Sequence, residues 1–144
     1  MNVHKYLDKI FGRAEEINGA ERCPTYMFRW VIAKAPWLKI YIHKFVGDDW
    51  SNDLHDHPKR FISIGLSGSY LERSRVSDRQ FVAPWIRSFP AEYAHRITTP
   101  FGTCWTLVIV FKQTREWGFW HNGRFIPWRA YVGSAIADKM KSCA

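Results

Sequence analysis

The residues best suited to chemistry lie in the segment LHDHPKRF, residues 54–61. His55 and His57 are separated by one residue, so on a β-strand both imidazoles project from one face while Asp56 points the other way. Neighbouring imidazoles suit a transition-metal ion. Pro58 lacks an amide hydrogen and fits a strand edge or a bend, such as a barrel mouth. The pair alone is a weak signal, because two polar residues near a turn have the same pattern.

The elements around this segment follow two periodicities. Apolar residues at three- and four-residue steps predict an amphipathic helix over residues 2–17, ended by Asn18-Gly19 and packed on the outside of the molecule. From about Tyr26 the period becomes two, and strand-like runs alternate with turn signals nearly to the end. Many short strands without βαβ alternation predict an all-β antiparallel sandwich or barrel.

The C-terminal part carries two further signals. Asn122-Gly123 stands between apolar runs and predicts a β-hairpin. A weak helical pattern over residues 128–140 predicts a terminal helix. No internal repeat is apparent, and a chain of 144 residues fits one compact domain. We therefore expect an N-terminal helix within residues 1–20 and one barrel domain over residues 21–144.

A third histidine follows a proline-led turn in the segment FPAEYAHRI, residues 89–97. With it, residues 40–111 resemble the cupin superfamily, whose motifs read G-x5-H-x-H-x3-4-E-x6-G and G-x5-P-x-G-x2-H-x3-N. The matching positions are His55, His57, Gly68, Pro90 and His95. The order of HDHP, a Gly-Ser hairpin and this segment also resembles small uncharacterised bacterial and phage-associated cupins. The resemblance implies a double-stranded β-helix, or jelly-roll barrel.

The sequence departs from the cupin pattern at the carboxylate ligand. Phe61, or Ile62 at the longer spacing, stands where the family has its glutamate, Glu92 replaces the turn glycine, and Thr99 replaces the asparagine. The resemblance then implies a metal centre of three histidines, His55, His57 and His95. It leaves Glu92 as a possible fourth ligand or as a hydrogen-bond partner of an imidazole.

Such a centre suits a divalent metal, with Fe(II) the first expectation and Zn(II), Ni(II), Mn(II) or Cu(II) as alternatives. Three-histidine cupins of this kind imply a dioxygenase-like enzyme acting on a small molecule. A cupin that only binds a small ligand is the alternative from another class. The resemblance also implies a homodimer.

The charge of the chain favours an anionic partner. Lys and Arg outnumber Asp and Glu by 21 to 13, for a net charge of +8. Arg60 and Arg96 are nearest in sequence to the histidines and could fix a carboxylate, although Arg96 should face away from the metal if its stretch is extended. A nucleic-acid-binding β-barrel is a weaker alternative, because no recognised RNA- or DNA-binding motif is present.

The cysteines and the N-terminus indicate the compartment. Cys23, Cys104 and Cys143 are odd in number and far apart, which predicts no disulfide and a reducing environment. Cys104, in an apolar strand, is interpreted as a small buried hydrophobe. Charges interrupt the apolar residues of the N-terminus, and no run is long enough to span a membrane. We therefore expect a cytoplasmic protein without a membrane partner.

Overall fold

The structure is a computed structural model that describes residues 2–20 and 23–143. Strands dominate this part of the chain, and three short helices accompany them. In chain order, the elements are α1 (Val3–Phe11), β1 (Glu15–Ile17), β2 (Met27–Ala35), β3 (Leu38–Phe45), β4 (Leu54–His55), β5 (Lys59–Ser67), β6 (Ser69–Ser74), β7 (Asp78–Val82), β8 (Trp85–Phe89), β9 (His95–Thr98), β10 (Cys104–Gln113), β11 (Gly118–His121), β12 (Arg124–Pro127), α2 (Trp128–Tyr131) and α3 (Ala135–Met140).

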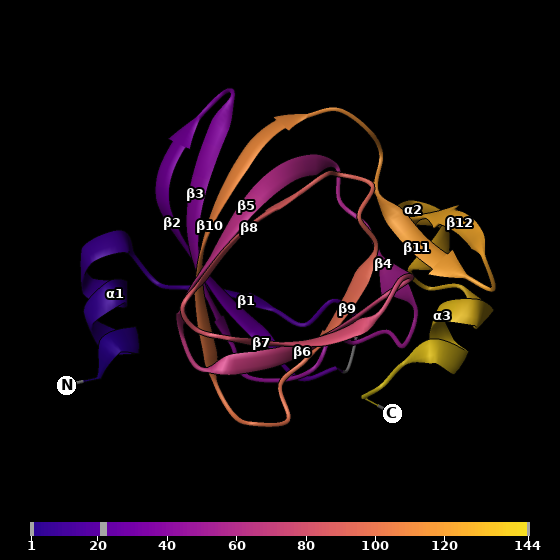
Figure 1. Ribbon diagram of the computed structural model, residues 1–144, viewed down its shortest axis with the longest axis horizontal. Helices are drawn as coiled ribbons and strands as arrows, with labels where there is room; N and C mark the ends of the chain where they lie inside the picture. The colour runs from indigo at the N-terminus through magenta and orange to yellow at the C-terminus, as the bar shows by residue number, and fades with distance from the viewer. Residues whose placement is uncertain (1, 21–22, 144) are drawn as a thin grey trace.

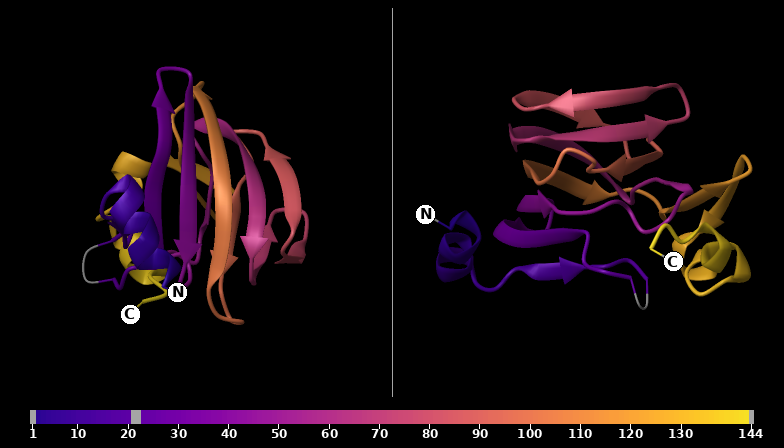
Figure 2. Two further views of the ribbon diagram at one scale, coloured as in Figure 1. Left: turned by 90° about the vertical axis from the view of Figure 1, so that its left-hand side faces the viewer. Right: turned by 90° about the horizontal axis from the view of Figure 1, so that it is seen from below.

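Two six-stranded antiparallel sheets face each other and enclose a central space (Figures 1 and 2). The first sheet has the order β1-β2-β3-β10-β5-β8 and the second the order β12-β11-β4-β9-β6-β7. Side chains alternate between inside and outside, as along β5, where Phe61, Ser63 and Gly65 are buried. The prediction of an all-β antiparallel architecture is confirmed.

Helix α1 covers the outer face of the first sheet, as expected (Figure 1). Leu7 and Ala14 pack on Trp30 of β2, whose side chain is only 1% exposed. Asp8 joins the two elements, because its Oδ1 accepts hydrogen bonds from Trp30 Nε1 at 2.9 Å and from the amide of Ala14 at 3.1 Å.

The predicted extent of this helix is wrong. It ends at Phe11 rather than at residue 17, because Gly12 takes a φ of 86° that stops the helical backbone. Residues 15–17 then pair with residues 27–29 as strand β1 of the first sheet. The pairing with a neighbouring strand overrides the helical spacing of the apolar residues there.

The C-terminal segment lies at the side of the barrel, where β11 pairs with β4 (Figure 1). The predicted hairpin is present between β11 and β12, with positive φ angles at Asn122 and Gly123. The predicted terminal helix is two short helices, α2 and α3. An aromatic cluster forms beneath them, in which the rings of Phe119 and Tyr131 stack at 4.0 Å and Trp50 packs against both.

Two cysteines join this end of the molecule to the loop after β1, so the prediction that no disulfide forms is wrong. Cys23 and Cys143 are paired, with Cα atoms 5.5 Å apart and a sequence separation of 120. The thiol of Cys104, in contrast, is fully buried, and its burial raises its pKa to about 12. The interpretation of Cys104 as a small buried hydrophobe is confirmed.

Among the described residues, no helix has the length and apolar character that crossing a bilayer requires.

Candidate metal centre

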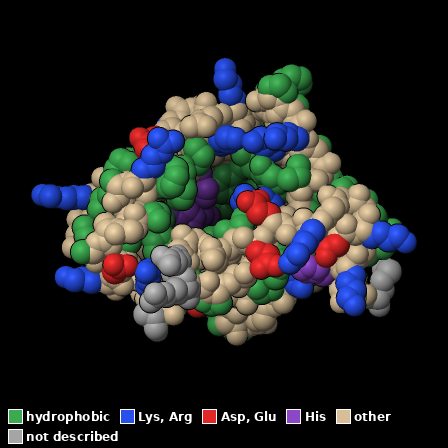
Figure 3. All heavy atoms as spheres, turned by 180° about the vertical axis from the view of Figure 1, so that it is seen from behind, with side chains coloured by type: hydrophobic (Ala, Val, Ile, Leu, Met, Phe, Trp, Pro, Cys, Tyr) green, Lys and Arg blue, Asp and Glu red, His purple; other side chains and the backbone are tan. Residues whose placement is uncertain are grey.

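A cavity of about 650 Å³ lies between the two sheets. Viewed from the face opposite Figure 1, it appears as a hollow with histidine on its wall and hydrophobic side chains around it (Figure 3). A volume of this order suits a small molecule. Aromatic side chains form much of the lining: Tyr26, Tyr41, Phe45, Trp50, Phe61, Tyr70, Trp117, Phe119 and Trp128.

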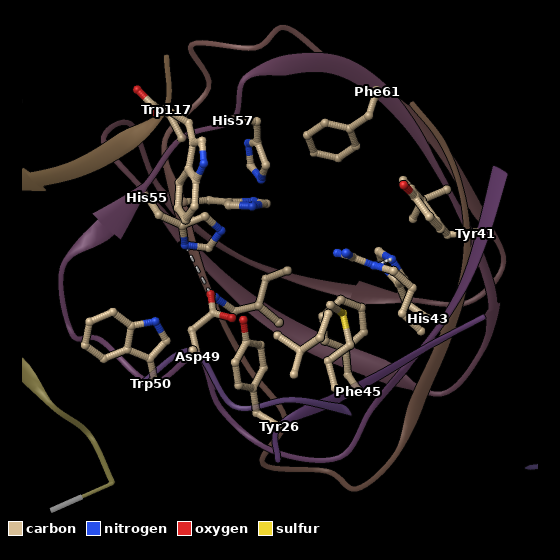
Figure 4. A pocket seen from close by; sticks show the side chains of 18 of the residues that line it. Tyr26, Tyr41, His43, Phe45, Asp49, Trp50, His55, His57, Phe61 and Trp117 are labelled. Carbon is tan, nitrogen blue, oxygen red and sulfur yellow. Dashed lines mark hydrogen bonds and ion pairs between the residues drawn. The ribbon is translucent and has the colours of Figure 1, made fainter. Parts of the chain in front are cut away.

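Three histidines meet on one side of this cavity (Figure 4). His55 lies in β4 and pairs in register with His95 of β9, while His57 follows β4 and donates its amide hydrogen to the carbonyl of Ala91 at 2.9 Å. One nitrogen of each ring lies within 4.8 Å of the corresponding nitrogens of the other two. The structure therefore brings together all three histidines singled out from the sequence.

A buried carboxylate orients the ring of His95. The Nδ1–H of His95 donates to Oε1 of Glu72 at 2.9 Å, and Oε2 of Glu72 accepts from Nη1 of Arg87 at 3.3 Å. Glu72 lies in β6 and is 2% exposed. With Nδ1 occupied in this way, the Nε2 lone pair of His95 is left for the cavity.

His55 has a carboxylate neighbour as well. Its Nδ1 lies 3.5 Å from Oδ2 of Asp49, which also accepts from the amide of Ile97 at 2.8 Å (Figure 4). The third ring differs, because His57 Nδ1 is buried and has no hydrogen-bond partner among the described residues. A buried nitrogen without a partner is costly. An ion bound by the cluster would satisfy such a nitrogen.

Burial sets the protonation of the cluster. Desolvation lowers the pKa of His57 and of His95 well below the usual value, and in both cases the neighbouring histidines add to the effect. Burial also raises the pKa values of Glu72 and Asp49, although Arg87 beside Glu72 and His55 beside Asp49 counteract it. His57 and His95 are therefore neutral near pH 7, the form in which imidazole binds metals.

These residues fit a divalent transition-metal ion. Nitrogen ligands lie about 2.0–2.1 Å from such an ion, so two ligands of one ion are separated by at most ~4 Å. The mutual spacing of the three nitrogens, within 4.8 Å, is close to that limit. Two of the rings have a carboxylate near the nitrogen that would not bind the metal, which is one of the common arrangements around metal-binding histidines.

The other candidates from the sequence lie elsewhere. Glu92 is exposed in the turn before β9 and does not line the cavity. Arg60 is exposed on the outside of β5, where its Nη2 donates to Ser88 Oγ at 3.0 Å. Arg96 donates from Nε to the carbonyl of Ser51 at 2.9 Å and faces away from the cluster, as the extended backbone predicted. None of the three is brought to the histidines.

Sequence reasoning missed Glu72 and Asp49. Glu72 carries a usable signal, because it alternates with Leu71 and Arg73 and so shares the inner face of β6 with buried Tyr70. A carboxylate on the buried face of a strand calls for a partner. Asp49 lies in a Gly-Asp-Asp loop, and no sequence pattern separates it from an ordinary turn residue.

Comparison with known proteins defines the fold. No protein-family model and no curated protein sequence matches the chain. Solved structures do match, among them a cupin superfamily protein from Desulfitobacterium hafniense, which superimposes with a TM-score of 0.52 at 15% identity over 69% of this chain and 100% of that one. The fold is that of the cupin superfamily. The double-stranded β-helix implied by the sequence motifs is thus confirmed.

Two other structures with this cupin fold are enzymes or metal proteins by name. The DMSP lyase DddQ from Ruegeria pomeroyi DSS-3 superimposes with a TM-score of 0.57 at 12% identity, over 77% of this chain and 64% of that one. Fe(II) HppE superimposes with a TM-score of 0.55 at 12% identity, over 68% of this chain and 56% of that one. In both cases the match spans less than two thirds of the other protein.

Proposed function

We propose that this cupin binds one divalent transition-metal ion through His55, His57 and His95, and uses it in dioxygenase-like chemistry on a small anionic molecule. The observation that carries the proposal is the convergence of three imidazoles, of which His57 and His95 are neutral near pH 7, on one side of a cavity large enough for a small molecule. Fe(II) is our first candidate for the ion. Fe(II) HppE, which shares the fold, supports that choice.

The chain's own residues prepare the site for such chemistry. Glu72 and Asp49 hold the rings of His95 and His55 by their Nδ1 atoms, and the rings of Phe61 and Phe119 lie beside His57 and His55. A bound ion would supply Lewis-acid or redox chemistry at open coordination positions. Three neutral ligands leave its positive charge uncompensated, which favours an anionic molecule at those positions.

Metal analysis tests the proposal directly. The purified protein should retain about one transition-metal ion per chain, and metal-stripped protein should take up Fe(II) or Zn(II) with the same stoichiometry. Because the pKa values of His57 and His95 lie well below the usual range, protons should compete with the metal for these two histidines only at pH values well below about 6.5. Protonation of these two ligands should therefore lower the affinity only in clearly acidic solution. A chain that takes up no ion at neutral pH would disprove the proposal.

Catalysis is tested separately. Fe(II)-loaded protein should consume oxygen with a member of a panel of thiols, diketones and keto acids. Binding of a panel compound without oxygen uptake would favour the ligand-binding alternative over an enzyme.

Glu72→Gln tests the role of the buried carboxylate. Glutamine keeps the size of the side chain and can still accept from His95 Nδ1–H, but it removes the negative charge. Loss of an outer partner of a metal ligand typically costs 10–100-fold in affinity. We expect the affinity for Zn(II) to fall about tenfold, measured by competition with a chromophoric chelator. Equal affinity in variant and wild type would show that Glu72 has no part in metal binding.

A further inference from the structure

A row of polar side chains crosses the wall of the cavity opposite the histidine cluster. Arg29 of β2 pairs in register with His43 of β3, and His43 pairs with Thr106 of β10, so the three residues lie side by side on the inner face of the first sheet. Figure 4 shows His43 across the cavity from His55 and His57.

The neighbouring positions on the same face are mostly apolar. On one side of the row, two residues along each strand, the buried side chains are Met27, Phe45 and Cys104. In the other direction, Tyr41 pairs with Val108. His43 and Thr106 of this row are buried, so their polar groups need hydrogen bonds from the protein or from a ligand.

The hydroxyl of Thr106 makes no such hydrogen bond within the described part of the chain. Thr106 is 1% exposed, and its Oγ1 has no hydrogen-bond partner among the described residues, although the residue lines the cavity. A buried hydroxyl without a partner costs free energy. A ligand that enters the cavity and offers an acceptor would remove this cost.

The guanidinium of Arg29 also has N–H groups that are available to a ligand. The Nε–H of Arg29 donates to Nε2 of His43 at 3.1 Å, and the guanidinium lies over the ring of Tyr41, 4.9 Å from the centroid. Nη1 is 3.7 Å from a carboxylate oxygen of Glu15, whose side chain is 62% exposed, so this ion pair is long and largely solvated. Within the described part of the chain, Arg29 makes no other hydrogen bond.

His43 and Tyr41 together fix the orientation of this guanidinium. Burial lowers the pKa of His43 well below its usual value, and Arg29 adds to the effect, so the ring is neutral and its Nε2 accepts from Arg29. The stacking on Tyr41 restricts the plane of the guanidinium. The remaining N–H groups of a guanidinium match the geometry of a carboxylate.

We infer that Arg29 and the hydroxyl of Thr106 form an anion subsite that binds the carboxylate end of the substrate, while the rest of the molecule reaches the three histidines across the cavity. This inference rests on the proposed function, because it is the proposed metal centre that would act on the other end of the substrate. It replaces Arg60 and Arg96, which lie outside the cavity, as the source of anion recognition. The substrate class is therefore a small organic acid with a second functional group.

Binding of a series of dicarboxylates tests this subsite. Malonate to pimelate are titrated by calorimetry into wild type, Arg29→Gln and Thr106→Val, each in metal-stripped and in Zn(II)-loaded form. The acid that binds wild type best should bind Arg29→Gln at least about tenfold more weakly, because a hydrogen-bonded charge is lost. Thr106→Val should weaken binding about fivefold. The uncharged diamide of the same acid should bind wild type and Arg29→Gln equally.

Controls separate a local effect from misfolding. Arg60→Gln makes the same chemical change on the outside of β5 and should leave acid binding unchanged. Thr106→Val removes a hydroxyl that has no hydrogen-bond partner among residues 2–20 and 23–143, so it should not lower the melting temperature. Arg29→Lys, which keeps the charge but not the planar fork, should fall between wild type and Arg29→Gln.

Two results would overturn the inference: no acid of the series binds wild type, or acids bind Arg29→Gln as tightly as wild type. Failure of the proposed function is distinguishable from either. If the chain takes up no metal, the titrations of metal-stripped protein still measure whether acid binding depends on Arg29.

Discussion

Replacing His57 or His95 with alanine is expected to reduce the affinity for Zn(II) or Fe(II) by at least about a hundredfold, because each change removes one of only three nitrogen ligands. Loss of an outer partner alone costs up to ~100-fold, and loss of a ligand should cost more. His57→Ala is the cleaner variant, since His57 Nδ1 has no hydrogen-bond partner among the described residues and no buried carboxylate depends on it. His95→Ala leaves the buried Glu72 without one of its hydrogen bonds, so its stability has to be measured alongside.

His121→Ala is the matched control. This histidine also pairs with a carboxylate, at 2.9 Å from Asp53, but it lies in β11 outside the cluster. Asp53 keeps a hydrogen bond from the hydroxyl of Tyr131 at 2.7 Å after the change. Metal content and affinity should therefore match wild type. The three-histidine assignment is wrong if His57→Ala keeps full metal content, or if His121→Ala loses as much as His57→Ala.

Much of this centre could be predicted because the histidines obey short-range rules. His55 and His57 share a face by the period of a strand, and His95 follows a proline-led turn that matches a motif of the fold. The β-hairpin at Asn122-Gly123 was predicted for the same reason, because its turn has a local signature. The N-terminal helix was predicted too long, since strand pairing of residues 15–17 is a tertiary interaction that local periodicity does not contain.

The residues that support the centre could not be found in the same way. Glu72 and Asp49 reach their histidines from other strands and loops, and Arg29 enters the cavity from a strand far before the motif. Proximity in sequence pointed instead to Arg60 and Arg96, which face away. Pairing of Cys23 with Cys143 likewise depends on how the two ends of the chain meet.

The aspartate between the two histidines is expected to contribute more to stability than an exposed acidic residue does. Asp56 is fully buried and points away from the cavity cluster toward β11, as the strand period predicted. Its carboxylate accepts from the amide of Gly118 at 2.9 Å and from Trp120 Nε1 at 3.0 Å, and it pairs with Arg115 Nη1 at 2.7 Å. It therefore ties the short strand β4, which has only two residues, to its neighbour.

Asp56→Ala should lower the free energy of unfolding by about 3 kcal/mol, at the lower end of the cost of breaking a buried ion pair, because Arg115 is partly exposed and can reach water. Asp138→Ala is the matched control, since Asp138 is 62% exposed and pairs with Lys141 on the surface. Its cost should stay below about 1 kcal/mol. Urea denaturation of both variants measures the difference. Because β4 also carries His55, Asp56→Ala should weaken metal binding as well, whereas equal stability of the two variants would show that Asp56 does not hold the strand in place.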